Sequence, residues 1–145
     1  MTVVADVYTK SKRSEIMSRV RNKGTTPEES VGTFLRDLGM KYRRNDRTLP
    51  GQPDFSIKSK KTAIFVNGCF WHGHRNCARA KLPQTNAVFW ATKIAINKRR
   101  DRRAMRKLRE KGWRVITIWQ CRLRKPDNVR ARLARRLIKK TPRVV

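Results

Sequence analysis

The fold is decided by the stretch from residue 62 to residue 119, which reads TAIFVNGCFWHGHRNCARAKLPQTNAVFWATKIAINKRRDRRAMRKLREKGWRVITIW. Its first five residues, Thr62–Val66, form an apolar run that predicts a strand buried on both faces. Ala87–Glu110 predicts a long helix that Gly112 terminates, and Trp113–Trp119 predicts another strand. A strand, a crossover helix and a second strand predict a parallel pair. Both strands should therefore end at the same edge of one sheet.

A second helix is predicted before this unit, over residues 25–39. Thr26 suits the N-cap and Pro27 the first helical position. The acids Glu28 and Glu29 then fall in the first turn, where the helix dipole favours negative charge. The apolar face of this helix and the glycine that ends it are Val31, Phe34, Leu35, Leu38 and Gly39.

The connection to Thr62 predicts a hairpin. Tyr42–Leu49 is interpreted as irregular or weakly extended, and Pro50–Pro53 as a turn. Asp54–Ile57 predicts a strand, which Lys58–Lys61 turns back toward Thr62.

The ends of the chain complete the expected organisation. A basic helix is predicted from about Asp127 to Lys139, and residues 1–24 form a basic N-terminal arm or short helix. No repeat or long linker divides residues 25–145, which we interpret as a single domain. The fold class is α/β, with a mixed sheet flanked by helices.

Composition narrows the functional classes. The chain has 145 residues, with 38 Lys and Arg against 10 Asp and Glu, so its net charge is +28 and its pI is about 11.7. No apolar run approaches the ~20 residues that span a bilayer, and Met1–Lys10 does not resemble a secretory signal. A membrane protein, a secreted disulfide scaffold and a coiled coil are excluded. A polyanion, first of all nucleic acid, is the expected partner, and the cytoplasm is the expected location.

The cysteines and histidines predict a zinc site. Cys69, His74 and Cys77 follow one strand closely, and Cys121 follows the other. Three thiolates and one imidazole make a closed tetrahedral set suited to structural Zn²⁺. Two alternatives remain open: His72 replaces His74 as ligand, or the cysteines are buried and inert.

A second cluster is expected near the same edge of the sheet. Asp54 opens one hairpin strand, and the next strand ends beside Asn67 and the loop that carries His72. A carboxylate near an imidazole in a strongly basic protein suits Mg²⁺-assisted hydrolysis of a phosphodiester. Alternatively, Asp54 is a turn residue whose carboxylate accepts backbone N–H groups after Pro53.

The long helix adds two polar residues to its apolar face. Asn97 and Asp101 share that face with Ile94, Ala104, Met105 and Leu108. Inward polar groups destabilise a fold unless they are paired or used. Asp101 pairs either with one of its many arginine neighbours or with His72, whose ring it would orient.

The same helix carries a basic run. Between Lys93 and Arg109 there are nine bases and one acid, Asp101. We interpret this run as a phosphate-binding surface rather than a merely solvated face. The expected contacts to the DNA backbone are Lys93, Asn97, Lys98, Arg99 and Arg100.

Aromatic pairs occur in the loop and at the start of the long helix. Phe70 and Trp71 lie in a polar, basic loop, where aromatic side chains can wedge between base pairs. The position of Trp90 is left open. Core positions are the favoured interpretation for Phe89, Trp113 and Trp119.

These motifs together resemble the very-short-patch repair endonuclease family. The segments that carry the resemblance are LPGQPDF at 49–55, NGCFWHGH at 67–74, Phe89-Trp90 with Asn97 and Asp101, GWRV at 112–115, and Cys121. The resemblance covers about residues 10–122. It implies a single-domain variant of the restriction-endonuclease-like fold and a nick on the 5′ side of the thymine in a T:G mismatch.

The resemblance also implies roles for single residues. Asp54 matches the Mg²⁺-binding carboxylate, and Val66 falls where the family binds metal through its backbone. His72 matches the catalytic histidine and Asp101 the carboxylate that supports it. Glu28 falls on an acid near the active site.

The remaining matches concern zinc and DNA. The structural zinc ligands are Cys69, His74, Cys77 and Cys121, and the intercalating aromatics are Phe70, Trp71 and Trp90. One departure is Asn67, which stands where well-known members have a second active-site histidine. An amide can donate a hydrogen bond to a phosphate but cannot take up a proton at neutral pH.

The leading hypothesis is therefore a Mg²⁺-dependent, strand-specific DNA nicking endonuclease of mismatch repair. A single cut at an asymmetric lesion suits a monomer, and mismatch-repair proteins are potential partners. Two alternatives remain: a related nuclease of restriction or defence with another substrate, and a zinc-stabilised DNA-binding protein whose active site has decayed.

Overall fold

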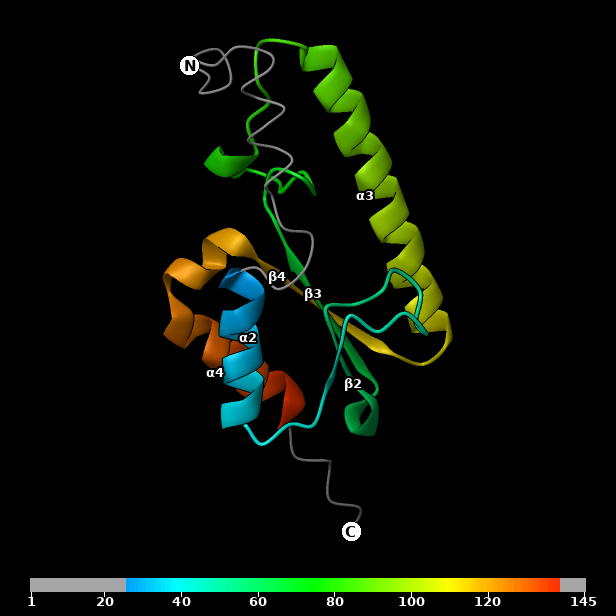
Figure 1. Cartoon of the computed structure of the whole chain (residues 1–145), viewed down its shortest axis with the longest axis vertical. Coiled ribbons are helices and arrows are strands. Elements are labelled where there is room, and N and C mark those ends of the chain that lie inside the picture. The colour runs from blue at the N-terminus through cyan, green and yellow to red at the C-terminus, as the bar shows by residue number, and fades with distance from the viewer. Residues whose placement is uncertain (1–25, 139–145) are drawn as a thin grey trace.

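The computed structural model describes residues 26–138 (Figure 1). The predicted arm at 1–24 and the end of the last predicted helix at Lys139 lie outside this range. The main elements are α2 (Thr26–Asp37), β1 (Arg43–Arg44), β2 (Phe55–Ile57), β3 (Thr62–Asn67), α3 (Ala87–Glu110), β4 (Arg114–Trp119) and α4 (Pro126–Leu137). Three short 3₁₀ helices connect them: η2 (Lys58–Lys60), η3 (Ala78–Ala80) and η4 (Gln120–Arg124).

The sheet is mixed, as predicted. Its strand order is β1-β2-β3-β4, with β1, β2 and β3 antiparallel in turn and β3 parallel to β4. The parallel pair runs from Thr62 opposite Arg114 to Asn67 opposite Trp119. The two strands therefore end side by side, and the residues that follow them meet at one edge of the sheet.

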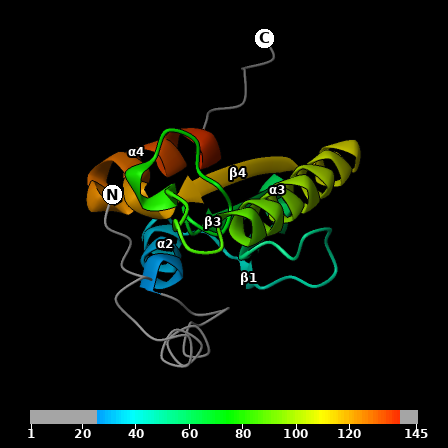
Figure 2. The ribbon, with the colours of Figure 1, turned by 90° about the horizontal axis from the view of Figure 1, so that it is seen from above.

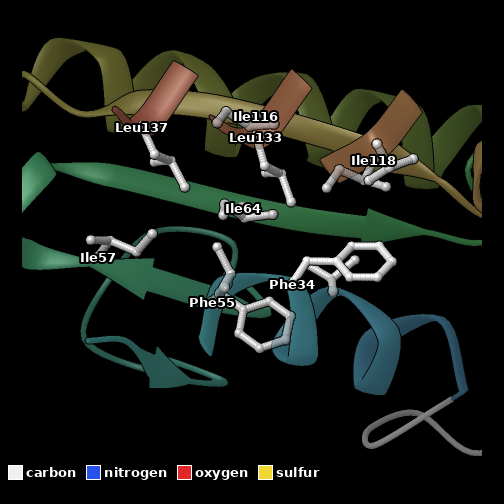
Figure 3. Packing of buried hydrophobic residues seen from close by; sticks show 11 residues of the cluster. Phe34, Phe55, Ile57, Ile64, Ile116, Ile118, Leu133 and Leu137 are labelled. Carbon is white, nitrogen blue, oxygen red and sulfur yellow. The ribbon is translucent and has the colours of Figure 1, made fainter. Parts of the chain in front are cut away.

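Helices cover both faces of this sheet. The main core joins α2 and α4 to one face, and α3 crosses the other face (Figures 1 and 2). Figure 3 shows the packing of this core, in which apolar residues of α2, α4 and the central strands interdigitate. Its largest fully buried members are Phe55, Leu35, Ile57, Ile64, Ile116, Ile118, Leu133 and Leu137. On the other face, α3 buries Ile94, Ala104 and Leu108.

Several boundaries differ from prediction by a residue or two. Helix α2 begins at Thr26 itself, β4 starts after Trp113, and α4 ends at Leu137. Strand β3 continues to Asn67, and Phe65 and Val66 are only half-buried, so the expectation of a strand buried on both faces is wrong at that end. These two residues border the cleft described below, which keeps part of their surface open.

A buried aspartate organises the segment before β2. The Asp46 carboxylate accepts hydrogen bonds from the Ser56 hydroxyl at 2.7 Å and from the Thr48 backbone N–H at 3.0 Å. Backbone bonds run from Asn45 N–H to the Asp54 carbonyl at 3.0 Å and from Asp46 N–H to the Pro53 carbonyl at 3.1 Å. This ladder holds the backbone of Asp54 in place at the entrance to β2.

Candidate active site

A cleft of about 850 Å³ opens at the end of β3. Its walls are the start of α2, the turn before β2, the first loop residues after β3 and the middle of α3. Asp54, Asn67, His72 and Asp101 all line it, so the structure brings together the residues predicted to form one pocket. Residues separated by almost fifty positions in the chain meet here because β2, β3 and α3 converge at this edge.

Asp54 accepts a hydrogen bond from the backbone of the neighbouring strand. The Val66 N–H donates to the Asp54 Oδ2 at 2.6 Å. The alternative that Asp54 accepts N–H groups of its own turn is wrong in this detail, because the donor lies twelve residues ahead. Burial, together with the negative charge of Glu28, raises the pKa of Asp54 to about 7, against the lowering effect of the Val66 N–H.

Glu28 lies beside Asp54 and is 4 % exposed. Its Oε2 is 3.5 Å from the Arg44 Nη2, and the same guanidinium donates a 2.9 Å hydrogen bond to Glu29. Arg44 is thus the counter-charge that compensates the buried carboxylate. Sequence reasoning missed Arg44, and its place beside Phe55 in the β1–β2 ladder is a tertiary feature.

This donor set fits a hard divalent cation. Two carboxylates, Asp54 and Glu28, line one cleft, and carboxylate oxygens are the ligands that Mg²⁺ takes in proteins. Burial first, and then the nearby charge of Glu28, disfavours the ionised form of Asp54 and raises its pKa. A cation between the two carboxylates would remove their repulsion.

His72 and Asp101 form a hydrogen-bonded pair. The His72 Nδ1 lies 2.6 Å from the Asp101 Oδ2, and the two side chains are 28 % and 27 % exposed. Within residues 26–138, Asp101 makes no ion pair with an arginine, so of its two predicted partners it takes His72. The bond occupies Nδ1 and leaves Nε2 of His72 available for chemistry.

Asn67 presents a free amide to the cleft. It is 9 % exposed, and its side chain has no hydrogen bond within the described part of the chain. Gln120 lines the same cleft from the end of β4, one residue beyond the strand that pairs with Asn67. Sequence reasoning missed Gln120, although the parallel register of β3 and β4 would have located it.

The four predicted zinc ligands converge on one point. The ligand atoms of Cys69, His74, Cys77 and Cys121 all lie within 4.8 Å of one another. The Cys121 Sγ is 3.4 Å from the His74 Nδ1, and the His74 ring stacks on Trp119 at 4.1 Å between centroids. Three sulfurs and one nitrogen at these separations fit a tetrahedral zinc ion. His72 is not part of the cluster.

Burial raises the pKa of the Cys69 thiol to about 11. Without a metal this sulfur therefore keeps its proton at neutral pH, and zinc binding would release it. The three cysteines form no disulfide in the structure. The cluster ties the loop after β3 to the end of β4.

The aromatic residues gather beside the cleft, and some of them differ from expectation. Phe70, Trp71 and Trp90 pack edge to face, with ring centroids 5.2 to 5.9 Å apart. Phe89 was expected in the core but is 57 % exposed, because it lies at the solvent side of the first turn of α3. The two tryptophans of the last predicted strand, also expected in the core, are only half-buried: Trp113 and Trp119.

Helix α3 holds the loop that carries these groups. The Asn97 amide donates to the Trp71 carbonyl at 3.0 Å and accepts a 2.8 Å bond from Arg100. Asn97 and Asp101, one helical turn apart, therefore bind consecutive loop residues, Trp71 and His72. Arg100 and Lys93, two of the bases expected to contact DNA, line the cleft, whereas Lys98 and Arg99 are exposed on α3 outside its lining.

None of the helices between Thr26 and Ile138 combines the length and the hydrophobicity of a membrane-spanning segment.

Comparison with known proteins identifies the family. The family model described as DNA mismatch endonuclease Vsr matches residues 5–79. The DNA mismatch endonuclease Vsr of Escherichia coli K12 is 41 % identical over 121 residues, which cover 83 % of this chain and 77 % of that protein. The type II nicking enzyme V.NmeAIP of Neisseria meningitidis serogroup A is 39 % identical over 132 residues, 91 % of this chain and 94 % of that protein.

A solved structure has a similar fold. The catalytic domain of the homing endonuclease I-Bth0305I superposes with a TM-score of 0.55 at 26 % identity, covering 79 % of this chain and 96 % of that domain. The mixed α/β architecture is thus that of an endonuclease. The chain belongs to the DNA mismatch endonuclease Vsr family and is a DNA-nicking endonuclease of that family.

Proposed function

We propose that the enzyme nicks one strand of duplex DNA on the 5′ side of the thymine in a T:G mismatch, the lesion left when 5-methylcytosine deaminates. The observation that carries this proposal is the cleft in which Asp54 and the His72–Asp101 pair face one space beside three clustered aromatic rings. A mismatched pair is cheaper to unstack than a matched one, so Phe70, Trp71 and Trp90 have a physical reason to favour it. Support also comes from the E. coli relative, whose name is that of a mismatch endonuclease.

The reaction joins a water oxygen to phosphorus and breaks the bond from phosphorus to the 3′ oxygen, leaving a 5′-phosphate and a 3′-hydroxyl. His72, held at Nδ1 by Asp101, moves a proton at Nε2, either from the attacking water or to the leaving oxygen. Asn67 donates its amide hydrogen to a phosphate oxygen but moves no proton. In this scheme only one imidazole is in a position to transfer a proton.

Mg²⁺ would be held by Asp54, with the Val66 backbone as a further ligand and Glu28 close by, and would supply stabilisation of the charge that develops on the phosphate. Zn²⁺ at Cys69, His74, Cys77 and Cys121 would have a structural role, because four protein ligands leave no open position for substrate. The intact His72–Asp101 pair argues against the alternative of a DNA-binding protein with a decayed active site.

The DNA backbone would be bound by Lys93, Lys98, Arg99 and Arg100, with Asn97 contacting it only if it gives up its bond to Trp71. We propose that the enzyme acts as a monomer in the cytoplasm, on the nucleoid, and that mismatch-repair proteins are its partners.

The printed names of several relatives favour a second candidate substrate. The similar proteins of Neisseria meningitidis and Xanthomonas oryzae are both named type II nicking enzymes. Under this candidate the enzyme belongs to a restriction system and cuts in another sequence context.

End-labelled duplexes decide between these candidates. The T:G duplex is compared with its T:A and C:G counterparts in Mg²⁺, in several sequence contexts, with Asp54→Asn as the inactive variant and the exposed Glu110→Gln as its charge-matched control. Nicking confined to T:G, 5′ to the thymine, supports the proposal. Equal cutting of matched duplexes would refute mismatch specificity, and nicking that survives Asp54→Asn would refute the role of Asp54.

A further inference from the structure

Four of the arginines on η4 and α4, the two helices that follow β4, make up one group. Burial, followed by the positive charges of Arg136, Arg122 and Arg135, lowers the pKa of Arg132. Arg122, Arg135 and Arg136 therefore each lie close enough to Arg132 to act on its charge. Arg132, Arg135 and Arg136 also share one face of α4, because they are three and four residues apart on that helix. Arg122 belongs to η4 and the other three to α4. We call these four residues the arginine surface.

Within residues 26–138, no acid forms an ion pair with the arginine surface. Residues 120–137 contain seven bases and one acid, Asp127. Within the described residues, the only ion pair made by a base of this stretch joins Arg130 to Asp37, and none involves the arginine surface. Such a concentration of charge destabilises the free protein, and a polyanion would remove the repulsion.

Part of the arginine surface is also held in place. The Arg132 Nη1 donates a 2.9 Å hydrogen bond to the Thr117 carbonyl of the edge strand β4. The Arg136 carbonyl in turn accepts a 2.9 Å bond from Arg114. These bonds fix α4 against β4, so that the exposed Arg135 and the half-buried Arg136 are presented on a firm support rather than on a loose segment.

The arginine surface begins where the cleft ends. Three consecutive residues make the connection: Gln120 lines the cleft, Cys121 belongs to the zinc cluster, and Arg122 is the first of the four arginines. From there the surface continues along α4, which lies on the opposite face of the sheet from α3 (Figures 1 and 2). The arginine surface is therefore separate from the bases of α3, which lie on the other face of the sheet.

We propose that the arginine surface binds backbone phosphates of the same duplex, in the flank that leaves the cleft past the zinc cluster. This inference rests on the proposed function for the position of the DNA, but it concerns a different set of residues. Guanidinium groups match phosphate geometry, and these contacts would carry no sequence information. They would add affinity for long duplexes and direct the flank toward α4.

The test compares two variants that each lose three charges. One variant is Arg122→Gln, Arg135→Gln and Arg136→Gln, which leaves the bond from Arg132 to Thr117 intact. The control variant is Lys58→Gln, Lys60→Gln and Lys111→Gln, three exposed bases outside the Lys93–Arg109 run. Its residues lie on η2 and near the end of α3, away from the carboxyl end of β3 where the cleft opens. Melting temperature and zinc content are measured for both, to show that they fold and keep the cluster.

Binding is then measured on mismatch duplexes of about 12 base pairs, and on the same duplexes extended by about 15 base pairs on one side or the other. For the parent protein, we expect tighter binding when one particular flank is extended. On the duplex with that flank, the arginine variant should bind about tenfold more weakly than the parent. The slope of its log affinity against log salt concentration on this duplex should be shallower by about 2.7, which is about 0.9 for each of three phosphates. The control variant should keep the gain from the flank, and both variants should nick the short duplex at the parent's rate.

Each other outcome overturns the inference. An equal loss of affinity on short and extended duplexes would mean that the arginines attract DNA only through the overall positive charge of the protein. No loss of affinity on any duplex would mean that the arginines contact no DNA. Binding of a second duplex in place of the flank, seen as a stoichiometry of two duplexes per protein, would refute the assignment to the same duplex. If the parent nicks no duplex at all, the proposed function fails, whereas the flank measurement can still succeed or fail by itself.

Discussion

The pairing of Asp101 with His72 predicts a defined loss of activity when the carboxylate is made neutral. Asp101→Asn keeps the shape of the side chain and an oxygen that can accept the His72 Nδ1–H, but it removes the negative charge from a 2.6 Å contact. A hydrogen bond to a charged group contributes about 1.5–3 kcal/mol, which corresponds to about 10–150-fold in rate. Both side chains are more than a quarter exposed, so solvent screening places the expected loss near the lower end, about 10–30-fold in kcat.

The assay is single-turnover nicking of an end-labelled mismatch duplex with saturating enzyme, which measures the chemical step. Because Asp101 contacts the reaction only through His72, the expected fall is in the rate at saturation, with no weakening of DNA binding. Glu110→Gln, an exposed acid at the end of the same helix, is the matched control and should nick at the parent's rate.

A double-mutant cycle makes the reasoning refutable. If Asp101 acts by orienting His72, then Asp101→Asn should have almost no further effect in a His72→Ala background. Additive losses in the double variant would show that Asp101 has a separate role, such as holding a cation, and the orientation argument would be wrong. The stability of each variant is checked by urea denaturation, so that unfolding is not mistaken for a catalytic loss.

Three further predictions concern stability and metal content. Burial and the charge of Glu28 raise the pKa of Asp54 to about 7 in the folded protein, above its unfolded value of about 3.9, so stability without Mg²⁺ falls as pH rises between these values. Asp54→Asn should therefore melt above the parent at about pH 8 in buffer without added Mg²⁺, and an advantage that did not shrink toward pH 4 would contradict this sign. Hydrogen bonds, chiefly from Thr48, lower the pKa of Asp46, so its contribution to folding stability is present above about pH 4 and lost in acid. Asp46→Ala leaves the Ser56 hydroxyl without its acceptor and should lower the free energy of unfolding by about 1–3 kcal/mol in urea denaturation at neutral pH, and an unchanged midpoint would refute this. Metal analysis should find about one zinc per chain. Cys121→Ser should lose the zinc and melt at a much lower temperature than the parent, whereas a fully folded parent without zinc would contradict the structural role.

The periodicity of the chain is enough to predict the elements around the site. The apolar runs of β3 and β4, separated by a 24-residue helix, imply a parallel pair from their order and spacing alone. The zinc cluster follows from the same reasoning, because ligands that come just after two parallel strands must meet at one edge. These features depend on local pattern and on chain topology, both of which can be read from sequence.

Tertiary packing decided what pattern could not. The sequence left Asp101 with two partners, and the choice of His72 depends on how α3 crosses the sheet and holds the loop after β3. Arg44 beside Glu28 depends on a two-residue strand too short to have a detectable period. Burial of the aromatic residues was misjudged because hydrophobicity alone does not say which side of a helix packs against the sheet. Phe89 lies on a side that stays 57 % exposed.

The sequence by itself determined the main helices, the strands around the site, the convergence of the three cysteines with the histidine loop, and the excess of positive charge, since each is a property of residue type and spacing. The structure alone decided which charges face one another. Distances between side chains remote in the chain, such as Asp54 and Glu28, are set by how the layers pack, and so is the solvation that controls their pKa values.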